Sequence, residues 1–203
     1  MNVLSIIGRE ENFRLVYFPK KQKRPMTDRL RNLLRSRNKF MENVRYQNRD
    51  SRLETSGKIV GFYEREFYCF SNFSSFAVKW KGKIWPTSEH AYQASRFMGK
   101  NPKIVEKIFK AKSADEAYKI AIKHFAKDMT KYGEKDVKIM ENIVRHKLKQ
   151  NPYVRHKLIQ TGKRLIVEDS PKDNFWGWGL KRNGRNELGK IWMKIRDEIN
   201  NKH

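Results

Sequence analysis

The chain has 203 residues, enough for one ordinary domain with a short extension. Its 46 Lys and Arg residues against 22 Asp and Glu give a formal net charge of +24, which favours polyanionic partners, nucleic acid before an anionic membrane surface. A single cysteine, Cys69, excludes an internal disulfide and a cysteine metal cluster, and no apolar run approaches the roughly 18 residues of a membrane span. We therefore expect an intracellular, cytoplasmic protein without a membrane partner.

Residues 1–56 are expected to form a basic N-terminal extension, separate from a domain over residues 57–203. The first sixty residues carry 15 basic against 6 acidic residues and no tryptophan. Residues 28–44 have the apolar spacing of a basic helix. A compact group of candidate nucleic-acid contacts lies just before it: Lys20, Lys21, Lys23 and Arg24. Two interpretations stay open, a solvated extension and an arm that neutralises phosphates.

From residue 57 onward the pattern predicts an α+β domain, mostly helical and with a small sheet. The expected strands are 58–63, 76–80, 84–85 and 164–167, with a turn at 81–83. Capping residues and prolines predict the helices 87–98, one from 101, one from 113 toward 127, 134–150, 151 to about 162, and 188–200. Ser113 and Glu116 have the spacing of a capping box.

The segment from Glu168 to Gly189 follows the last expected strand and combines tryptophans, glycines and acids. Glycines let a backbone approach a ligand closely, and indoles offer a stacking surface. This composition favours a ligand-binding loop. Asp173 either contacts the ligand or caps the loop, and the two tryptophans, Trp176 and Trp178, either pack in the core or leave one ring facing a groove.

Glu89 lies in the first turn of the helix expected after Thr87. A glutamate there can simply complement the helix dipole, which is worth about 0.3–1 kcal/mol. It can also be a carboxylate directed at a ligand. The sequence leaves both interpretations open, and we expect the neighbouring His90 to be a hydrogen-bonded structural residue rather than a base.

Lys147 is an unusual residue for its position on the helix expected over 134–150. It falls on the same face as the apolar residues Met140, Ile143, Val144 and Leu148. Most lysines in such positions extend to solvent. A desolvated amine would instead have a lowered pKa and become a nucleophile for a carbonyl group.

Other common sites are missing from the sequence. The five histidines have no metal-ligand spacing, and neither a dinucleotide-binding glycine motif nor a phosphate-binding loop is present. We expect no metal and no cofactor.

Six motifs in order resemble those of the NADAR family, which includes the YbiA-like N-glycosidases. They are 70–73 (FSNF), 85–94 (WPTSEHAYQA), Lys147 with Gln150 and Asn151, 167–168 (VE), 173–179 (DNFWGWG) and 184–189 (GRNELG). The resemblance covers residues 57–200 and implies the α+β fold of that family. Lys147 matches its motif, whereas Arg96 stands where the family often has lysine, and an arginine cannot form an imine.

The resemblance implies hydrolysis of a bond between ribose C1′ and a nitrogen, without a metal or cofactor. It implies that Glu89 is the general acid/base, that Lys147 forms a Schiff base with a ring-opened ribose, and that Asp173 holds sugar hydroxyls or assists proton transfer. The implied pocket residues are Asn72, Phe73, Trp85, Ser88, His90, Tyr92, Trp176, Gly177, Gly179 and Asn186.

The family's substrates are ribosylated intermediates of riboflavin biosynthesis and ADP-ribose attached to guanine in nucleic acid. The charge of +24 favours removal of ADP-ribose from guanine bases in nucleic acid. The alternatives are an N-glycosidase of riboflavin intermediates and a non-catalytic module that binds ADP-ribose or nucleic acid.

Overall fold

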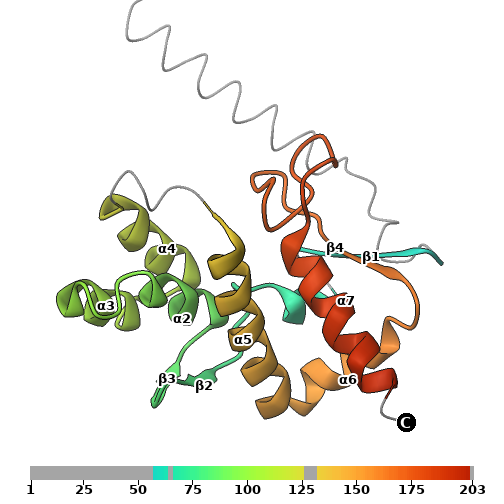
Figure 1. Ribbon diagram of the computed structural model, residues 1–203, viewed down its shortest axis with the longest axis horizontal. Coiled ribbons are helices and arrows are strands. Elements are labelled where there is room, and N and C mark those ends of the chain that lie inside the picture. The colour runs from blue at the N-terminus through green and yellow to red at the C-terminus, as the bar shows by residue number, and fades with distance from the viewer. Residues whose placement is uncertain (1–56, 64–65, 126–131, 202–203) are drawn as a thin grey trace, which may run out of the picture. The chain divides into compact units, whose positions relative to one another are not determined.

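The computed structural model describes residues 57–63, 66–125 and 132–201 (Figure 1). These residues belong to one compact unit of the chain, Asp50–His203. The predicted extension over 1–56, with its basic group at 20–24 and the helix over 28–44, lies outside the described residues.

The described residues form an α+β domain that is mostly helical, as predicted. In chain order the elements are β1 (Ile59–Phe62), the 3₁₀ turn η2 (Tyr68–Phe70), β2 (Val78–Trp80), β3 (Lys83–Trp85), α2 (Ser88–Ser95), α3 (Pro102–Phe109), α4 (Ala114–Lys123), α5 (Glu134–Gln150), α6 (Pro152–Gln160), β4 (Leu165–Glu168) and α7 (Glu187–Asn200). None of the described helices has the length and apolar character needed to cross a membrane.

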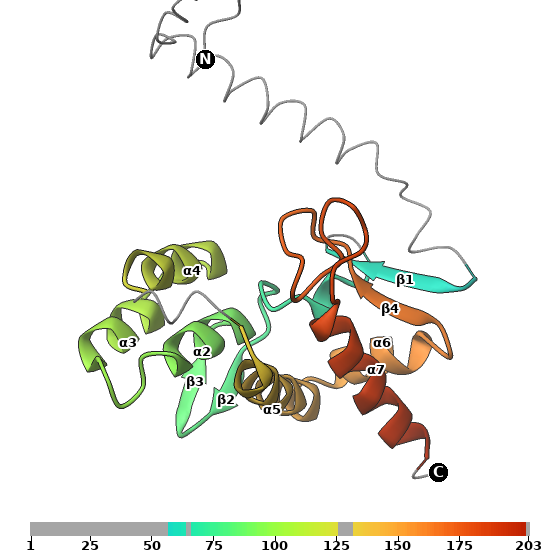
Figure 2. The ribbon, with the colours of Figure 1, turned by 45° about the horizontal axis from the view of Figure 1, so that its top comes forward.

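Helix α5 is the central element of this domain (Figures 1 and 2). It packs against α2 on one side and against α7 on the other. Helices α3 and α4 pack with α2, whereas α7 packs on β4 and α6. The buried face of α5 carries Met140, Ile143 and Val144, and this stripe joins the two groups of elements into one core.

The strands form two separate pairs instead of one small sheet. β2 and β3 are an antiparallel hairpin whose turn residues, Lys81 and Gly82, have φ of 48° and 76°. Two consecutive positive φ angles match a two-residue hairpin turn, which confirms the predicted turn. β1 and β4 pair in parallel although about a hundred residues separate them, with Phe62 opposite Glu168. Their carboxyl ends therefore meet at one edge, where β4 leads into the glycine-rich loop.

Side-chain caps fix where several helices begin. The Thr87 hydroxyl accepts a hydrogen bond from the His90 N–H at 3.3 Å, and the Ser113 hydroxyl accepts one from the Glu116 N–H at 3.1 Å. The predicted capping box is not closed, because the Glu116 carboxylate accepts from the Lys112 N–H, one residue earlier. Helix α2 ends at Ser95, short of the predicted residue 98, and the chain continues in turns up to the expected stop at Gly99.

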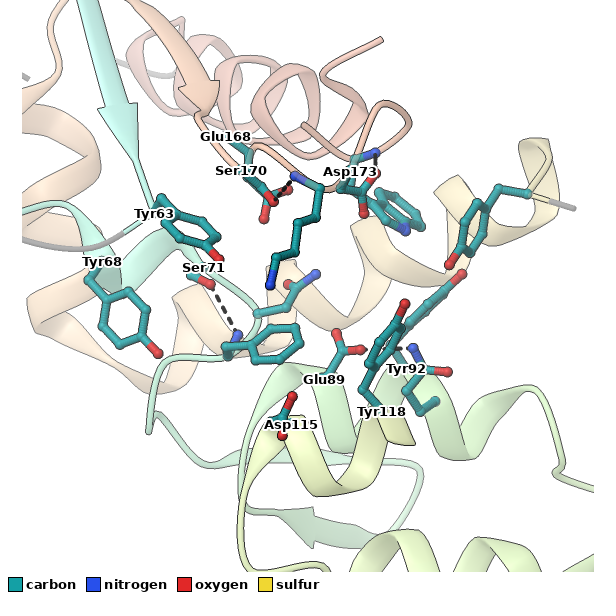
Figure 3. Close-up of a pocket in the computed structure, with 16 residues that line it drawn as sticks. Tyr63, Tyr68, Ser71, Glu89, Tyr92, Asp115, Tyr118, Glu168, Ser170 and Asp173 are labelled. Atoms are coloured by element: carbon teal, nitrogen blue, oxygen red, sulfur yellow. Dashed lines mark hydrogen bonds between the residues drawn. The ribbon is translucent and has the colours of Figure 1, made fainter. Parts of the chain in front are cut away.

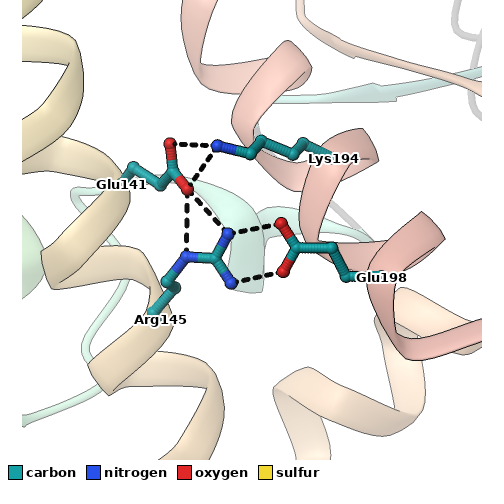
Figure 4. Close-up of polar contacts among 4 residues, drawn as sticks. All are labelled: Glu141, Arg145, Lys194 and Glu198. Atoms are coloured by element: carbon teal, nitrogen blue, oxygen red, sulfur yellow. Dashed lines mark hydrogen bonds and ion pairs between the residues drawn. The ribbon is translucent and has the colours of Figure 1, made fainter. Parts of the chain in front are cut away.

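A group of charged side chains joins α5 to α7 at the surface (Figure 4). Arg145 donates two hydrogen bonds to Glu198, at 2.6 and 2.7 Å, and also contacts Glu141. Lys194 donates to the same Glu141 carboxylate at 2.8 Å. This network fixes α5 against α7 above the buried contacts and so positions the face of α5 that carries Lys147.

Candidate active site

A cavity of about 620 Å³ opens between the α2–α4 group and the loop after β4 (Figure 3). Its volume lies within the range of small-molecule sites. The lining residues are mainly aromatic and acidic: Tyr63, Tyr68, Ser71, Asn72, Phe73, Glu89, Tyr92, Gln93, Asp115, Tyr118, Tyr132, Glu168, Ser170, Lys172, Asp173 and Trp176. The structure thus brings the first motif, the start of α2 and the glycine-rich loop to one cavity.

Glu89 is directed into this cavity from the first turn of α2 (Figure 3). Its side chain is only 5% exposed, and one carboxylate oxygen accepts a hydrogen bond from the Gln93 amide at 2.8 Å. Burial raises the pKa of Glu89 to about 7, and the nearby negative charge of Asp173 acts in the same direction. A carboxyl group with such a pKa can donate and accept a proton near neutral pH.

Glu168, the last residue of β4, is a second buried carboxyl group at the cavity. One of its oxygens, Oε2, has no hydrogen-bond partner within the described part of the chain. Burial, followed by the charges of Asp173 and Glu89, holds its pKa well above the usual value. The motif at 167–168 contains this residue, but no pattern in the sequence assigns it a role.

Asp173 caps the loop, which confirms one of the two interpretations, and it also lines the cavity, where contact with a ligand stays a prediction. Its Oδ1 accepts hydrogen bonds from the N–H groups of Phe175 at 2.8 Å and Trp176 at 2.7 Å. These bonds set the path of the backbone that carries the Trp176 ring into the cavity wall.

Aromatic rings form much of the remaining wall. Trp176 packs edge-on against Tyr92, with 5.4 Å between ring centroids, and against Tyr132 at 5.9 Å. Phe73 lies 6.4 Å from Tyr118 on α4. Flat rings of this kind suit a sugar face or a base. Of these five rings, Tyr118 and Tyr132 were not anticipated, since neither belongs to a recognised motif.

Two amides supply polar atoms between the rings. Asn72, an expected pocket residue, is buried, and its Oδ1 has no hydrogen-bond partner in the described residues. The Oε1 atom of Gln93, whose amide group contacts Glu89, is likewise buried without a hydrogen-bond partner in the described residues. Unpaired buried polar atoms are costly, so these two are natural contacts for a ligand.

Lys147 is completely buried and stands behind the cavity wall rather than among its lining residues. Its Nζ donates hydrogen bonds to the Ser71 carbonyl oxygen at 2.9 Å and to the Ser74 hydroxyl at 2.7 Å. Burial lowers its pKa to about 7. The structure therefore shows the desolvated amine that the helix pattern allowed, but directs it at the loop that carries Asn72.

Three residues near Glu89 that were expected to line the pocket do not line the cavity. Trp85 is buried, packs edge-on against Phe109 and donates from its indole N–H to the Trp80 carbonyl at 3.0 Å. The His90 ring joins Thr87, at 2.8 Å, to the Ala111 carbonyl, at 3.1 Å, which confirms a structural histidine. Ser88 is fully buried and does not line the cavity.

The expected pocket residues Gly177, Gly179 and Asn186 shape the loop rather than line the cavity. A Cβ on Gly177 would lie 2.6 Å from the Glu168 carbonyl oxygen, and Gly179 has a φ of +66°. Asn186 has a left-handed backbone conformation, with a φ of 53°. Its side-chain amide accepts a hydrogen bond from the Glu168 N–H at 3.0 Å and donates one to the Ile166 carbonyl oxygen at 2.9 Å. These three residues bind the loop to β4 and thereby position Glu168.

Arg96, where the resembled family often has lysine, supports the wall from behind. Its guanidinium lies 3.7 Å from Asp136 and donates to the Tyr92 hydroxyl at 3.2 Å. It also stacks 5.1 Å from the centre of the Tyr132 ring. Arg96 thus supports two residues of the cavity wall, Tyr92 and Tyr132. In the described ranges, no group of three His, Cys, Asp or Glu side chains is arranged to hold a metal ion.

Comparison with known proteins identifies the family of the chain. The profile of the NADAR domain matches residues 61–200, and the chain belongs to the NADAR family. It is 36% identical over 145 residues to the N-glycosidase Npun_R5314 of Nostoc punctiforme, a match that covers 70% of this chain and 93% of that protein. It is 32% identical to the N-glycosidase YbiA of Escherichia coli, covering 70% and 88%.

Two further similarities place the fold and extend the family. The solved NMR structure of the E. coli protein YbiA superposes with a TM-score of 0.62 at 30% identity, covering 71% of this chain and 86% of that one. A riboflavin biosynthesis protein of Vibrio vulnificus is 36% identical over 129 residues, but the match spans only 35% of its length. These relatives place the chain among hydrolases that act on N-glycosyl bonds.

Proposed function

We propose that the protein hydrolyses the bond between a ribose C1′ and a nitrogen, and that it removes ADP-ribose from guanine bases in nucleic acid. The observation that carries the proposal is Glu89, a buried carboxyl group with a pKa of about 7 that faces an aromatic and acidic cavity. Departure of a nitrogen from a sugar needs a proton donor, and cationic character at C1′ needs negative charge nearby.

In the proposed reaction, protonated Glu89 donates its proton to the departing nitrogen. The C1′–N bond breaks, and its electron pair leaves with that nitrogen. The cationic C1′ is stabilised by the Asp173 carboxylate, while Trp176 and Tyr92 pack against the sugar. A water molecule then adds to C1′ and returns a proton to Glu89, which restores the starting state.

The nucleic-acid substrate is supported by charge. The full chain carries +24, far more than binding of a small metabolite requires, and its first sixty residues hold 15 basic against 6 acidic residues. We propose that Lys20, Lys21, Lys23 and Arg24 contact phosphates. Changing all four to glutamine in the full chain should weaken DNA binding and flatten its salt dependence. An unchanged salt slope would contradict this assignment.

A second substrate, a ribosylated intermediate of riboflavin biosynthesis, is favoured by a different observation. The relative from Vibrio vulnificus is named a riboflavin biosynthesis protein. A paired assay separates the two substrates: release of ADP-ribose from guanine-modified DNA, and release of ribose phosphate from the ribosylaminopyrimidine. Activity on the pyrimidine alone would refute the nucleic-acid substrate.

We also propose a covalent role for Lys147, which the comparisons leave open. Its lowered pKa makes a neutral amine accessible near pH 7, and its hydrogen bond to Ser71, a lining residue, places the amine directly behind the cavity wall. In this alternative to direct attack by water, the Lys147 amine exchanges its hydrogen bonds to Ser71 and Ser74 for the sugar and adds to C1′ of the ring-opened ribose. The C1′–N bond to the base breaks, the nitrogen leaves with the proton from Glu89, and water then hydrolyses the imine to release the sugar and the amine. Borohydride trapping during turnover should attach sugar to Lys147. Full activity with an unmodified Lys147 would refute the imine.

A further inference from the structure

The charges around the cavity are unbalanced. Four carboxyl groups line it, from Glu89, Asp115, Glu168 and Asp173. Among the described lining residues there is a single basic side chain, Lys172. Burial raises the pKa of Glu89 and of Glu168, which favours their neutral forms near pH 7, so the repulsion of an anionic ligand comes chiefly from Asp115 and Asp173. Among the described lining residues, attraction for an anionic group comes from the one ammonium group.

We propose that Lys172 is a specificity-determining residue that binds the phosphate attached to C5′ of the substrate ribose. The inference rests on the proposed N-glycosidase function and adds to it the recognition of a particular group. A terminal monophosphate and the pyrophosphate of ADP-ribose both place a phosphate at this carbon. The proposal therefore applies to either candidate substrate.

Lys172 is free to bind an anion. No described residue forms a hydrogen bond or ion pair with its side chain, which is exposed on the loop after β4. The charges that act on Glu89 and Glu168 come from other residues, so Lys172 is not their counter-ion. An unpaired ammonium group at the edge of an acidic cavity is suited to a phosphate from the substrate.

The neighbouring side chains fit the same role. Lys172 follows Ser170 by two residues, and its N–H donates to the Ser170 hydroxyl at 3.4 Å. Ser170 and Tyr63 lie on one side of the cavity, opposite Glu89 and Tyr118 (Figure 3). A ribose that spans the cavity would direct C1′ toward Glu89 and C5′ toward the Ser170 side. The reacting bond and the phosphate would then have separate subsites.

The test compares ligands with and without the phosphate on wild type, Lys172→Met and Lys172→Arg. Binding of ribose 5-phosphate, ADP-ribose and unphosphorylated ribose is measured by calorimetry, which needs no turnover. We expect Lys172→Met to weaken both phosphate ligands about tenfold and to leave ribose unchanged, because a charged hydrogen bond is lost. Lys172→Arg should keep most of the affinity. Lys181→Met, an exposed lysine of the same loop outside the cavity, is the matched control.

Kinetics extends the same comparison. For a phosphorylated N-ribosyl substrate, Lys172→Met should raise KM about tenfold with little change in kcat, because the contact is remote from the broken bond. Equal loss of phosphorylated and unphosphorylated ligands, or no loss at all, would overturn the assignment. If only one phosphate ligand responds, that ligand identifies the phosphate source. Phosphate binding that depends on Lys172 in a protein without turnover would support the subsite and refute the N-glycosidase function instead.

Discussion

Replacement of Glu89 by glutamine should raise the stability of the folded protein at pH 8 and sharply reduce its turnover. The pKa of this buried carboxyl group rises from an ordinary 4.5 to about 7 in the folded protein. Because the folded-state value is the higher one, the wild type keeps its full stability below pH 4.5 and loses part of it as the pH rises through about 7. A shift of this size corresponds to roughly 3 kcal/mol at pH 8.

Glutamine has nearly the same shape and can still accept the hydrogen bond from Gln93, but it does not ionise. Glu89→Gln should therefore be up to roughly 3 kcal/mol more stable than wild type at pH 8 and nearly equal to it at pH 4.5. Turnover should fall by roughly 10²–10⁴, the range of a lost general acid, while product binding is largely kept.

Urea unfolding at pH 4.5, 6 and 8 measures the first effect, and product release measures the second. Glu106→Gln is the matched control, because it makes the same chemical change on a half-exposed residue whose pKa is lowered by Lys83 and Lys110, so any loss of stability should appear at high pH rather than a gain. Equal stability differences at all three pH values would refute the buried-carboxyl account. Retained turnover in Glu89→Gln would refute its catalytic role, and absence of turnover in the wild type on both substrates would favour a binding module.

Three other changes test separate parts of the structure. Asp173→Asn keeps the acceptor for the loop N–H groups but removes a charge that raises the pKa of Glu89. The fall in kcat/KM above about pH 7 should therefore move to lower pH, and an unmoved profile would show that the charge of Asp173 does not act on Glu89. Gly179→Ala should destabilise the protein by roughly 1–3 kcal/mol, because φ is +66° and the added methyl group meets Asn174, and an unchanged urea midpoint would contradict this. Arg145→Gln should cost about 1 kcal/mol in low salt and less in high salt, since the network joining α5 to α7 is partly exposed; equal losses at both salt levels would show that packing matters more than charge.

Local sequence signals predicted most of the elements. The predicted limits of helix α5 match the observed ones, and its apolar stripe singled out Lys147 while leaving open whether the side chain reaches solvent or is buried; the structure shows it buried. The hairpin turn and most helix starts followed from glycine, proline and capping residues. The parallel pairing of β1 with β4 was not predictable, because the sequence carries no local signal for a partner about a hundred residues away.

The site was only partly predictable for a related reason. Glu89 and His90 are adjacent in sequence, but they lie about 100° apart around α2, so one faces the cavity and the other the Ala111 carbonyl. Recognised motifs also mix roles: Trp176 lines the cavity, whereas Gly177 allows the close approach of the loop to β4. Glu168 and Lys172 gain their importance only from what the fold brings near them.

The most direct test of the central claim is the release of ADP-ribose from guanine-modified DNA by the full chain, followed between pH 5 and 9. We expect free ADP-ribose and restored guanine, with a rate that falls as Glu89 loses its proton near pH 7. No release from this substrate at any pH, together with none from the ribosylaminopyrimidine, would contradict the N-glycosidase account.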